Sequence, residues 1–242
     1  MTSFFRALAV ALLAACTLAP SANANVLIGG TRVILPAKDG EVTVRLTNDN
    51  TTPALVQAWI DTGDAKSTPD SVDTPFLITP PMFRMEPNRD QSLRILYTRE
   101  PLPADRESLF WLNVLEVPPK PADREATGSN YMQLALRSRL KLFFRPAGLQ
   151  GDPLKAPGDL VFQVSGNGLV VRNPTPFHIT MTDVVVDAGG KSLTSEGGMV
   201  APMSELRLVV TGLSAAAASA PVRFNAINDF GAPAAFTGAV AP

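Results

Sequence analysis

The sequence predicts an all-β fold of two immunoglobulin-like β-sandwich domains. Short runs of alternating apolar and polar residues recur between turn signals, and no stretch makes a convincing amphipathic helix. The chain also contains 22 prolines, which favour a turn-rich β architecture over helices. Without an N-terminal leader of 24 residues, about 218 residues remain, enough for two domains of roughly 100 residues each.

The predicted strands fall into two groups on either side of a segment rich in proline and glycine. The first group covers 26–35, 42–48, 55–61, 76–79, 93–98, 109–117 and 132–144. The second group covers 160–164, 169–172, 177–186, 205–211, 222–227 and 234–240. We therefore expect a first domain at 25–145, a linker at 146–158 and a second, smaller domain at 159–242. The small residues of 215–220 bury little surface, so we expect a loop there.

Residues 1–24 have the pattern of a secretory signal peptide. Arg6 supplies a positive charge, 7–18 are apolar, and Ala22-Asn23-Ala24 forms a small-residue cleavage site. The apolar stretch is too short to span a membrane, and no later stretch is apolar enough to be a transmembrane helix. Residues 13–16 also resemble the lipobox of bacterial lipoproteins. The sequence thus predicts export, with cleavage either after Ala24 or before Cys16.

Composition argues against catalysis, metal binding and nucleic-acid binding. Cys16 is the only cysteine, so the mature chain has no disulfide and relies on its core. Removing the leader leaves 20 basic and 22 acidic residues, whereas nucleic-acid binders concentrate basic charge. The single histidine, His178, lies in a predicted strand and is interpreted as structural. Zinc clusters and Ser-His or Cys-His dyads therefore lack their components, and no P-loop or G-x-S-x-G motif is present. We expect no catalytic residue, no metal and no cofactor.

The most informative segment is 130–146, which reads N-Y-M-Q-L-A-L-R-S-R-L-K-L-F-F-R-P. Its even positions from Met132 to Phe144 are apolar except Ser138, whereas Arg137, Arg139 and other odd positions are mostly polar. This period of two predicts a strand with one solvent-exposed face. At ~3.3 Å per residue the strand would be roughly 45 Å long. Proteins avoid long apolar strands with an open edge, because such strands recruit other chains. The segment therefore predicts a strand that pairs with a partner.

The end of this segment reads R-x-R-x-K-L-F-F-R-P and resembles the end of the first domain in periplasmic pilus-assembly chaperones, the PapD-like partners of outer-membrane ushers. Further matches follow in the family's order and extend the resemblance over about 31–231. They are T-R-V-I at 31–34, V-Q-A-W-I-D at 56–61, P-F-L-I-T-P-P-M-F-R-M-E-P at 75–87, L-R-I at 93–95, L-P-A-D-R-E-S-L-F-W-L-N at 102–113, N-P-T-P-F at 173–177 and N-D-F-G at 228–231. The departures are Phe144, Phe177 and Phe230, where the family often has Tyr, and Leu35, where an aromatic is common.

The resemblance implies a soluble periplasmic chaperone whose two immunoglobulin-like domains are arranged around a cleft. Such a chaperone binds, folds and caps pilus or fimbrial subunits by donor-strand complementation and delivers them to an outer-membrane usher. The short stretch at 120–130 and the absence of mature cysteine favour the short-loop subfamily. Which subunit and usher are served, and whether the free protein self-caps as a dimer, is left open.

The resemblance also implies three sets of site residues. Arg32 and Lys141 would bind the C-terminal carboxylate of a subunit, the first as a planar fork and the second as a point charge. Their alternative interpretation is that of solvated surface charges. The apolar residues Met132, Leu134 and Leu136 would fill the groove of a subunit that lacks its last strand. Alternatively, they cover the chain's own core.

The third set is Glu107, Arg145 and Asp229, which would form a charged cluster between the domains and hold the cleft angle. The alternative is three unrelated surface charges. Two other functional classes predict different features. A pilus subunit or adhesin would lack the paired cations and have one incomplete domain, whereas a secreted hydrolase would need a polar cluster that this chain does not supply.

Overall fold

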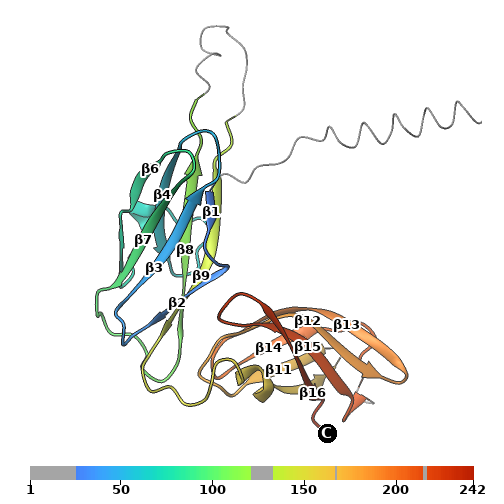
Figure 1. The fold of residues 1–242 in the computed structure, drawn as a ribbon. Helices are drawn as coiled ribbons and strands as arrows, with labels where there is room; N and C mark the ends of the chain where they lie inside the picture. The colour runs from blue at the N-terminus through green and yellow to red at the C-terminus, as the bar shows by residue number, and fades with distance from the viewer. Residues whose placement is uncertain (1–25, 121–132, 167, 215–216) are drawn as a thin grey trace, which may run out of the picture.

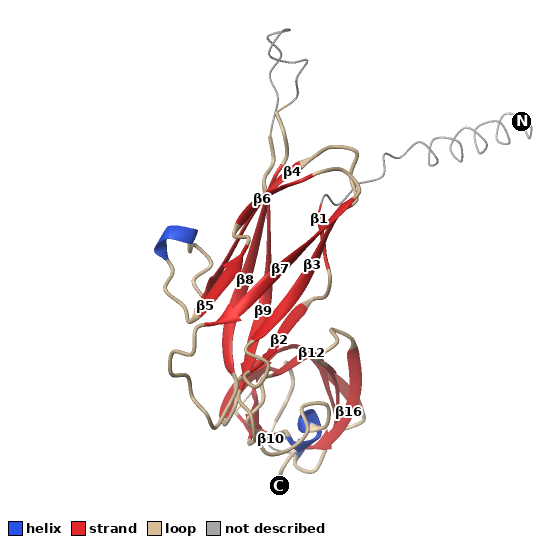
Figure 2. Ribbon diagram, turned by 60° about the vertical axis from the view of Figure 1, so that its left-hand side comes forward, coloured by secondary structure: helices blue, strands red, loops and turns tan. Residues whose placement is uncertain are grey.

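The computed structural model describes residues 26–120, 133–166, 168–214 and 217–242. The predicted signal peptide, Met132 and nearly all of the short stretch at 120–130 lie outside these ranges. The described part consists of strands, loops and two short 3-10 helices, η1 (Pro69–Ser71) and η2 (Ala156–Asp159) (Figure 2). Within it, no helix is long and apolar enough to cross a membrane. The predicted all-β fold of two immunoglobulin-like domains is confirmed.

The first domain is a sandwich of a four-stranded sheet, ordered β1-β3-β7-β5, and a five-stranded sheet, ordered β2-β9-β8-β4-β6. Alternating side chains of the two sheets meet in one core, which includes the fully buried Leu35, Leu46 and Leu142. The strands are β1 (Val26–Ile28), β2 (Arg32–Pro36), β3 (Glu41–Asn48), β4 (Ala54–Asp61), β5 (Phe76–Thr79), β6 (Met82–Met85), β7 (Arg89–Tyr97), β8 (Ser108–Val117) and β9 (Leu136–Arg145).

The second domain pairs a three-stranded sheet, ordered β10-β11-β14, with a four-stranded sheet, ordered β13-β12-β15-β16. Its core is separate from that of the first domain and includes the buried residues Phe162, Leu169 and Val186. The strands are β10 (Val161–Ser165), β11 (Gly168–Asn173), β12 (Ile179–Ala188), β13 (Lys191–Val200), β14 (Ser204–Val209), β15 (Pro221–Ile227) and β16 (Pro233–Ala239).

Three differences from the predicted strands have local causes. The single strand predicted at 26–35 is two strands, because the chain turns at Gly29 and Gly30, where φ of Gly30 is 118°. As a result β1 pairs with β3 in one sheet and β2 pairs with β9 in the other. Strands β6 and β13 were not predicted. β6 is only four residues long and follows two prolines, whereas β13 interrupts its alternation with Gly197 and Gly198.

The prediction of a strand over 132–144 is wrong at its N-terminal end. β9 begins at Leu136, and residues 133–135 are not in a strand. The last rung of the β8–β9 ladder pairs Leu136 with Glu116, and β8 ends one residue later. Pro118 and Pro119 follow, and proline has no backbone N–H with which to continue a ladder. The N-terminal part of the predicted strand therefore has no partner on β8.

The two domains meet where β2 begins and β9 ends, and together they make a bent molecule (Figure 1). The loop between β15 and β16 approaches the start of β2. Its Gly231 has φ of 84°, and a Cβ atom there would lie 2.3 Å from Oγ1 of Thr31. Only glycine therefore lets this loop close against the first domain. A backbone bond from Glu107 N–H to the carbonyl of Pro176, 2.9 Å long, adds a second contact.

Candidate functional site

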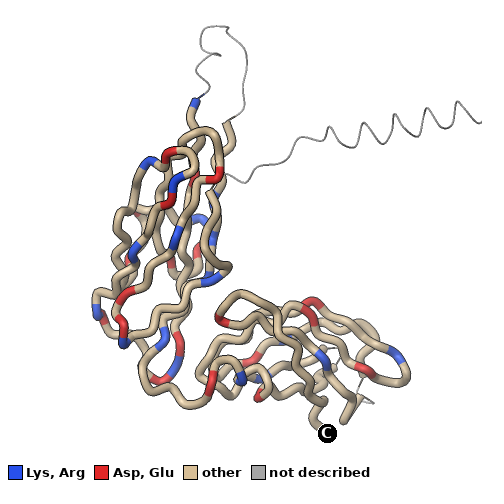
Figure 3. The backbone as a smooth tube through the Cα atoms, viewed as in Figure 1, with Lys and Arg blue, Asp and Glu red and all other residues tan. Residues whose placement is uncertain are grey.

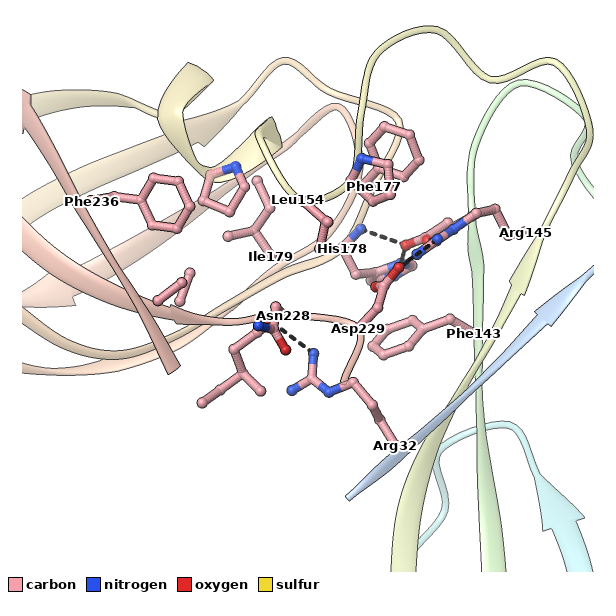
Figure 4. A pocket seen from close by; sticks show the side chains of 16 residues that line it. Arg32, Phe143, Arg145, Leu154, Phe177, His178, Ile179, Asn228, Asp229 and Phe236 are labelled. Atoms are coloured by element: carbon pink, nitrogen blue, oxygen red, sulfur yellow. Dashed lines mark hydrogen bonds and ion pairs between the residues drawn. The ribbon is translucent and has the colours of Figure 1, made fainter. Parts of the chain in front are cut away.

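Two cations from the first domain lie side by side where the domains meet. Arg32 on β2 is directly opposite Lys141 on β9 in the parallel ladder, so both side chains project from the same face of the sheet. Arg32 Nη1 donates to the backbone carbonyl of Ile227 at 3.0 Å, and Lys141 Nζ donates to Oγ1 of Thr180 at 3.1 Å. Figure 4 shows Arg32 reaching towards the second domain. The fold thus brings the two predicted cations together although they are far apart in the sequence.

Neither cation has a carboxylate partner among the residues that the structure describes. Burial lowers the pKa of Arg32, an effect that the charges of Asp229 and Glu107 only partly offset. Burial and then the positive charge of Arg32 lower the pKa of Lys141. In addition, the buried Nε of Arg32 has no hydrogen-bond partner in the described structure. Like charges that are partly desolvated and unpaired favour an incoming anion, so this arrangement suits a carboxylate.

The three residues of the predicted charged cluster also come together at the junction of the domains, where Figure 4 shows Arg145 beside Asp229. Arg145 Nε donates to Glu107 Oε1 at 2.7 Å, and its two terminal nitrogens donate to the carboxylate of Asp229 at 2.7 and 2.9 Å. Glu107 is 4% exposed and also accepts the backbone N–H of His178 at 2.7 Å. Because Glu107 and Arg145 belong to the first domain and Asp229 and His178 to the second, the cluster ties the domains together.

His178 is a member of this cluster that the sequence did not identify. Its ring Nδ1 lies 3.3 Å from Glu107 Oε2, and its ring lies 5.2 Å from that of Phe143 on β9. The interpretation of His178 as a structural residue agrees with this position. Burial lowers the pKa of Arg145, but the bonds to Asp229 and the charges of both carboxylates outweigh burial and raise that pKa overall. The guanidinium is therefore held firmly in its charged form.

Alanine at Arg145 or at Asp229 is expected to lower the free energy of unfolding, by about 3 kcal/mol for Arg145, because removing one member strands buried charge. The double variant should cost at least about 1 kcal/mol less than the sum of the singles, since both changes break one network. Urea unfolding of the four chains measures this coupling. The exposed ion pair of Arg223 with Asp187 provides the control, and its loss should leave the free energy of unfolding almost unchanged, because solvent screens the pair. Strict additivity at Arg145 and Asp229 would show that no cluster exists.

Strand β9 has an open edge next to the cation pair. β8 pairs with β9 from Phe144 back to Leu136, whereas β2 pairs only with Lys141–Arg145. Residues 136–140 therefore lack a second neighbour among the described strands. Leu134 is 72% exposed and Leu136 is 56% exposed, so these two residues do not cover the chain's own core. Met132, the third predicted apolar residue, lies outside the described residues.

The described residues do not form a metal-binding site. No group of three or more His, Cys, Asp or Glu side chains within the described ranges could hold a metal ion. Lysine and arginine are interspersed with acidic residues over most of the chain (Figure 3), but β9 carries four basic residues and no acidic residue. Arg137, Arg139 and Arg145 form ion pairs with carboxylates, whereas the partly buried Arg32 and Lys141 form none within the described residues.

Comparison with known proteins gives a consistent result over the whole described chain. The family model described as pili and flagellar-assembly chaperone, PapD N-terminal domain, matches residues 25–150, and the model of the pili assembly chaperone PapD C-terminal domain matches 155–237. The chain is 45% identical over 251 residues to chaperone protein FimB/FhaD of Bordetella pertussis, with 100% of both chains covered. It is also 45% identical over 216 residues to the probable fimbrial chaperone YadV of Escherichia coli, covering 87% of this chain and 88% of YadV.

Solved structures agree with these matches. The crystal structure of the YadV chaperone superimposes with a TM-score of 0.76 at 41% identity, covering 90% of this chain and 100% of YadV. The structure of the Salmonella enterica SafA pilin in complex with the SafB chaperone matches with a TM-score of 0.73 at 31% identity, covering 91% of this chain and 99% of the matched chain.

Proposed function

The chain belongs to the PapD family of periplasmic pilus-assembly chaperones, a non-enzymatic family, and on this premise we propose that it caps pilus or fimbrial subunits by donor-strand complementation. The observation that carries the proposal is the open edge of β9 at 136–140. At one end of this edge lie two cations that have no carboxylate partner among the described residues, and at the other lie two exposed leucines. A strand with these features can bind both the terminal charge and the apolar groove of one extended partner.

Arg32 and Lys141 anchor the C-terminal carboxylate of the subunit in this mechanism. Arginine offers two parallel N–H donors, and lysine adds a compact charge from the neighbouring strand. Each hydrogen bond to a charged group is worth about 1.5–3 kcal/mol. A carboxylate bound between the two side chains also supplies the counter-charge that neither cation has within the described structure. The anchor thereby sets the register of the subunit along β9.

The open edge of β9 then supplies backbone hydrogen bonds, and Leu134 and Leu136, with Met132 beyond them, enter the groove of the subunit. Burying each of these side chains contributes roughly 1.5–3 kcal/mol. Three of them together approach the whole stability of a domain, about 5–15 kcal/mol, which is enough to keep an incomplete subunit folded. SafB, a relative whose structure was solved in complex with a pilin, supports this class of partner.

Delivery of the capped subunit to an outer-membrane usher completes the proposal. No nucleotide is needed, because the folding free energy stored in the subunit can drive its transfer. Residues 25–145 act in this account as the subunit-binding domain and 159–242 as the second wall of the cleft, joined by the linker at 146–158. Without a subunit, the same edge of β9 can pair with a second copy, and we include such a self-capping dimer in the proposal.

Co-expression with a pilin subunit in the periplasm tests the proposal. The subunit is made in two forms, one with its natural C-terminus and one extended by several glycines that move the carboxylate away from its last strand. We expect the chain to co-purify with the natural form and to leave the extended form to proteolysis. Equal capture of both forms would refute the carboxylate anchor. Capture of neither form would refute the chaperone function for that subunit.

A further inference from the structure

The open stretch of β9 at 136–140 pairs with β8 along one edge, and its side chains pack against the domain mainly from one face. On the apolar face, Leu136 is 56% exposed and Ser138 is half-buried, so packing against the domain core begins only at Leu140, which is 7% exposed. Edge segments with few buried contacts open locally at little cost in free energy. The opposite face carries Arg137 and Arg139, both only partly exposed. Besides the backbone ladder with β8, the side-chain contacts that keep this stretch extended are therefore chiefly those of these two arginines.

Arg137 is saturated with hydrogen bonds to neutral groups. Its Nε and Nη2 donate to Oδ1 of Asn113 on β8 at 3.0 and 2.7 Å. Its Nη1 donates to the carbonyl of Ala65 at 2.9 Å, and Nη2 also reaches Oγ of Ser67 at 3.1 Å. The guanidinium lies 4.6 Å from the ring centre of Trp59 on β4. One side chain thus ties β9 to β8, to β4 and to the loop after β4.

Arg139 makes the second tie, to a buried carboxylate. Its Nη2 donates to Oδ1 of Asp61 at 2.5 Å, and its guanidinium lies 4.5 Å from the ring centre of Trp111. Asp61 is 1% exposed and also accepts from Asn113 at 2.7 Å and Ser67 at 3.1 Å. Burial raises the pKa of Asp61, but these hydrogen bonds outweigh burial and lower it below its usual value, so the carboxylate stays charged. The two arginines share Asn113, Ser67 and Asp61 as one network.

We propose that Arg137 and Arg139 are positioning residues for subunit capture, which hold 136–140 extended, with its edge open and its leucine face outward, before a subunit arrives. This inference rests on the proposed function. A strand that is already extended does not pay the ordering entropy when it binds. If the stretch were extended only a fraction of the time, the apparent affinity would fall by that fraction. Since all three guanidinium nitrogens of Arg137 are occupied within the chain, it acts through β9 and not by touching the subunit.

Arg137→Met tests the proposal, because it keeps the length of the side chain and leaves no buried charge unpaired. Hydrogen exchange of the amides at 136–140 should become faster, while that of β3 and β7 stays unchanged. Subunit binding should weaken by about tenfold, the factor expected if the stretch is extended only about a tenth of the time. Arg137→Lys keeps a cation near Trp59 and should recover part of both effects. Arg45→Met is the matched control, since Arg45 pairs only with Asp90 on the other sheet and should change neither measurement.

The outcomes separate this inference from the proposed function. If the parent chain captures subunit and the Arg137→Met chain captures it equally well, the inference alone is overturned. Weaker capture without faster exchange at 136–140 would also overturn it, because the arginine would then contact the subunit directly. A parent chain that captures no subunit would overturn the proposed function and this inference with it. Thermal unfolding of each variant shows whether the domain as a whole remains folded.

Discussion

Replacing Lys141 by Met is expected to weaken subunit capture by about 10- to 100-fold and to leave the free chaperone at least as stable as the parent. The loss corresponds to one hydrogen bond to a charged group, about 1.5–3 kcal/mol. Stability should not fall, because burial and the charge of Arg32 lower the pKa of Lys141. A base whose pKa is lower in the folded than in the unfolded chain destabilises the fold while it is charged, at any pH below its folded pKa. Methionine removes that charge and keeps most of the apolar stem.

Arg32→Met should weaken capture to a similar or greater extent, because two donors of its fork are lost. Titration of a fluorescent peptide carrying a subunit's C-terminal strand measures affinity, and thermal unfolding measures stability. Lys191→Met is the control, since Lys191 is exposed in the second domain, where β13 begins. Undiminished affinity in both Arg32 and Lys141 variants would rule out the anchor. Weaker binding accompanied by unfolding would instead assign these cations to the domain interface.

The sequence predicts the strands that have a strong apolar pattern of their own. It does not predict strand boundaries that depend on pairing with a neighbouring strand. β4 and β8 were predicted closely, because they are rich in apolar residues and are interrupted only by single polar residues such as Gln57 and Asn113. The start of β9 could not be predicted from its own residues, because the strand continues only as far as its partner β8 does. β13 was missed for the opposite reason, since its pairing with β12 compensates for the glycines that weaken its own pattern.

The candidate site also combines features that the sequence predicts with contacts that depend on strand pairing. Periodicity places Arg137, Arg139 and Lys141 on one polar face of a strand, and that expectation treats them alike. The structure separates them, because a long side chain reaches across the sheet to partners that only the strand register brings near. Arg137 and Arg139 donate hydrogen bonds to Asn113 and Asp61 on β8 and β4, whereas among the described residues Lys141 donates one to Thr180 of the second domain. The proximity of Lys141 to Arg32 came from the family resemblance and could not have come from periodicity.

The double variant Leu134→Glu with Leu136→Glu is expected to abolish protection of subunits while leaving the chaperone itself folded. Both leucines are largely exposed, at 72% and 56%, so the free protein loses little burial. In the proposed complex, the lost burial of two leucines alone costs about 3–6 kcal/mol, more than 100-fold in affinity. Each glutamate would in addition carry a charge into an apolar groove, where desolvation opposes it. Survival of a co-expressed subunit against added protease is the measurement, together with the unfolding temperature of the free variant.

A matched pair of substitutions tests whether the loss of subunit protection depends on the position of these leucines on β9 or only on charges added at exposed sites. Leu77 is 63% exposed on β5 of the first domain, and Val209 is 72% exposed on β14 of the second. Leu77→Glu with Val209→Glu adds the same two charges at similarly exposed sites away from β9, and it should protect subunits as well as the parent does. Equal failure of both double variants would point to net charge rather than to the edge of β9. Unfolding of the Leu134 and Leu136 variant would show that these residues support the chain's own core, and the subunit-binding face would then have to be the one that carries Arg137 and Arg139.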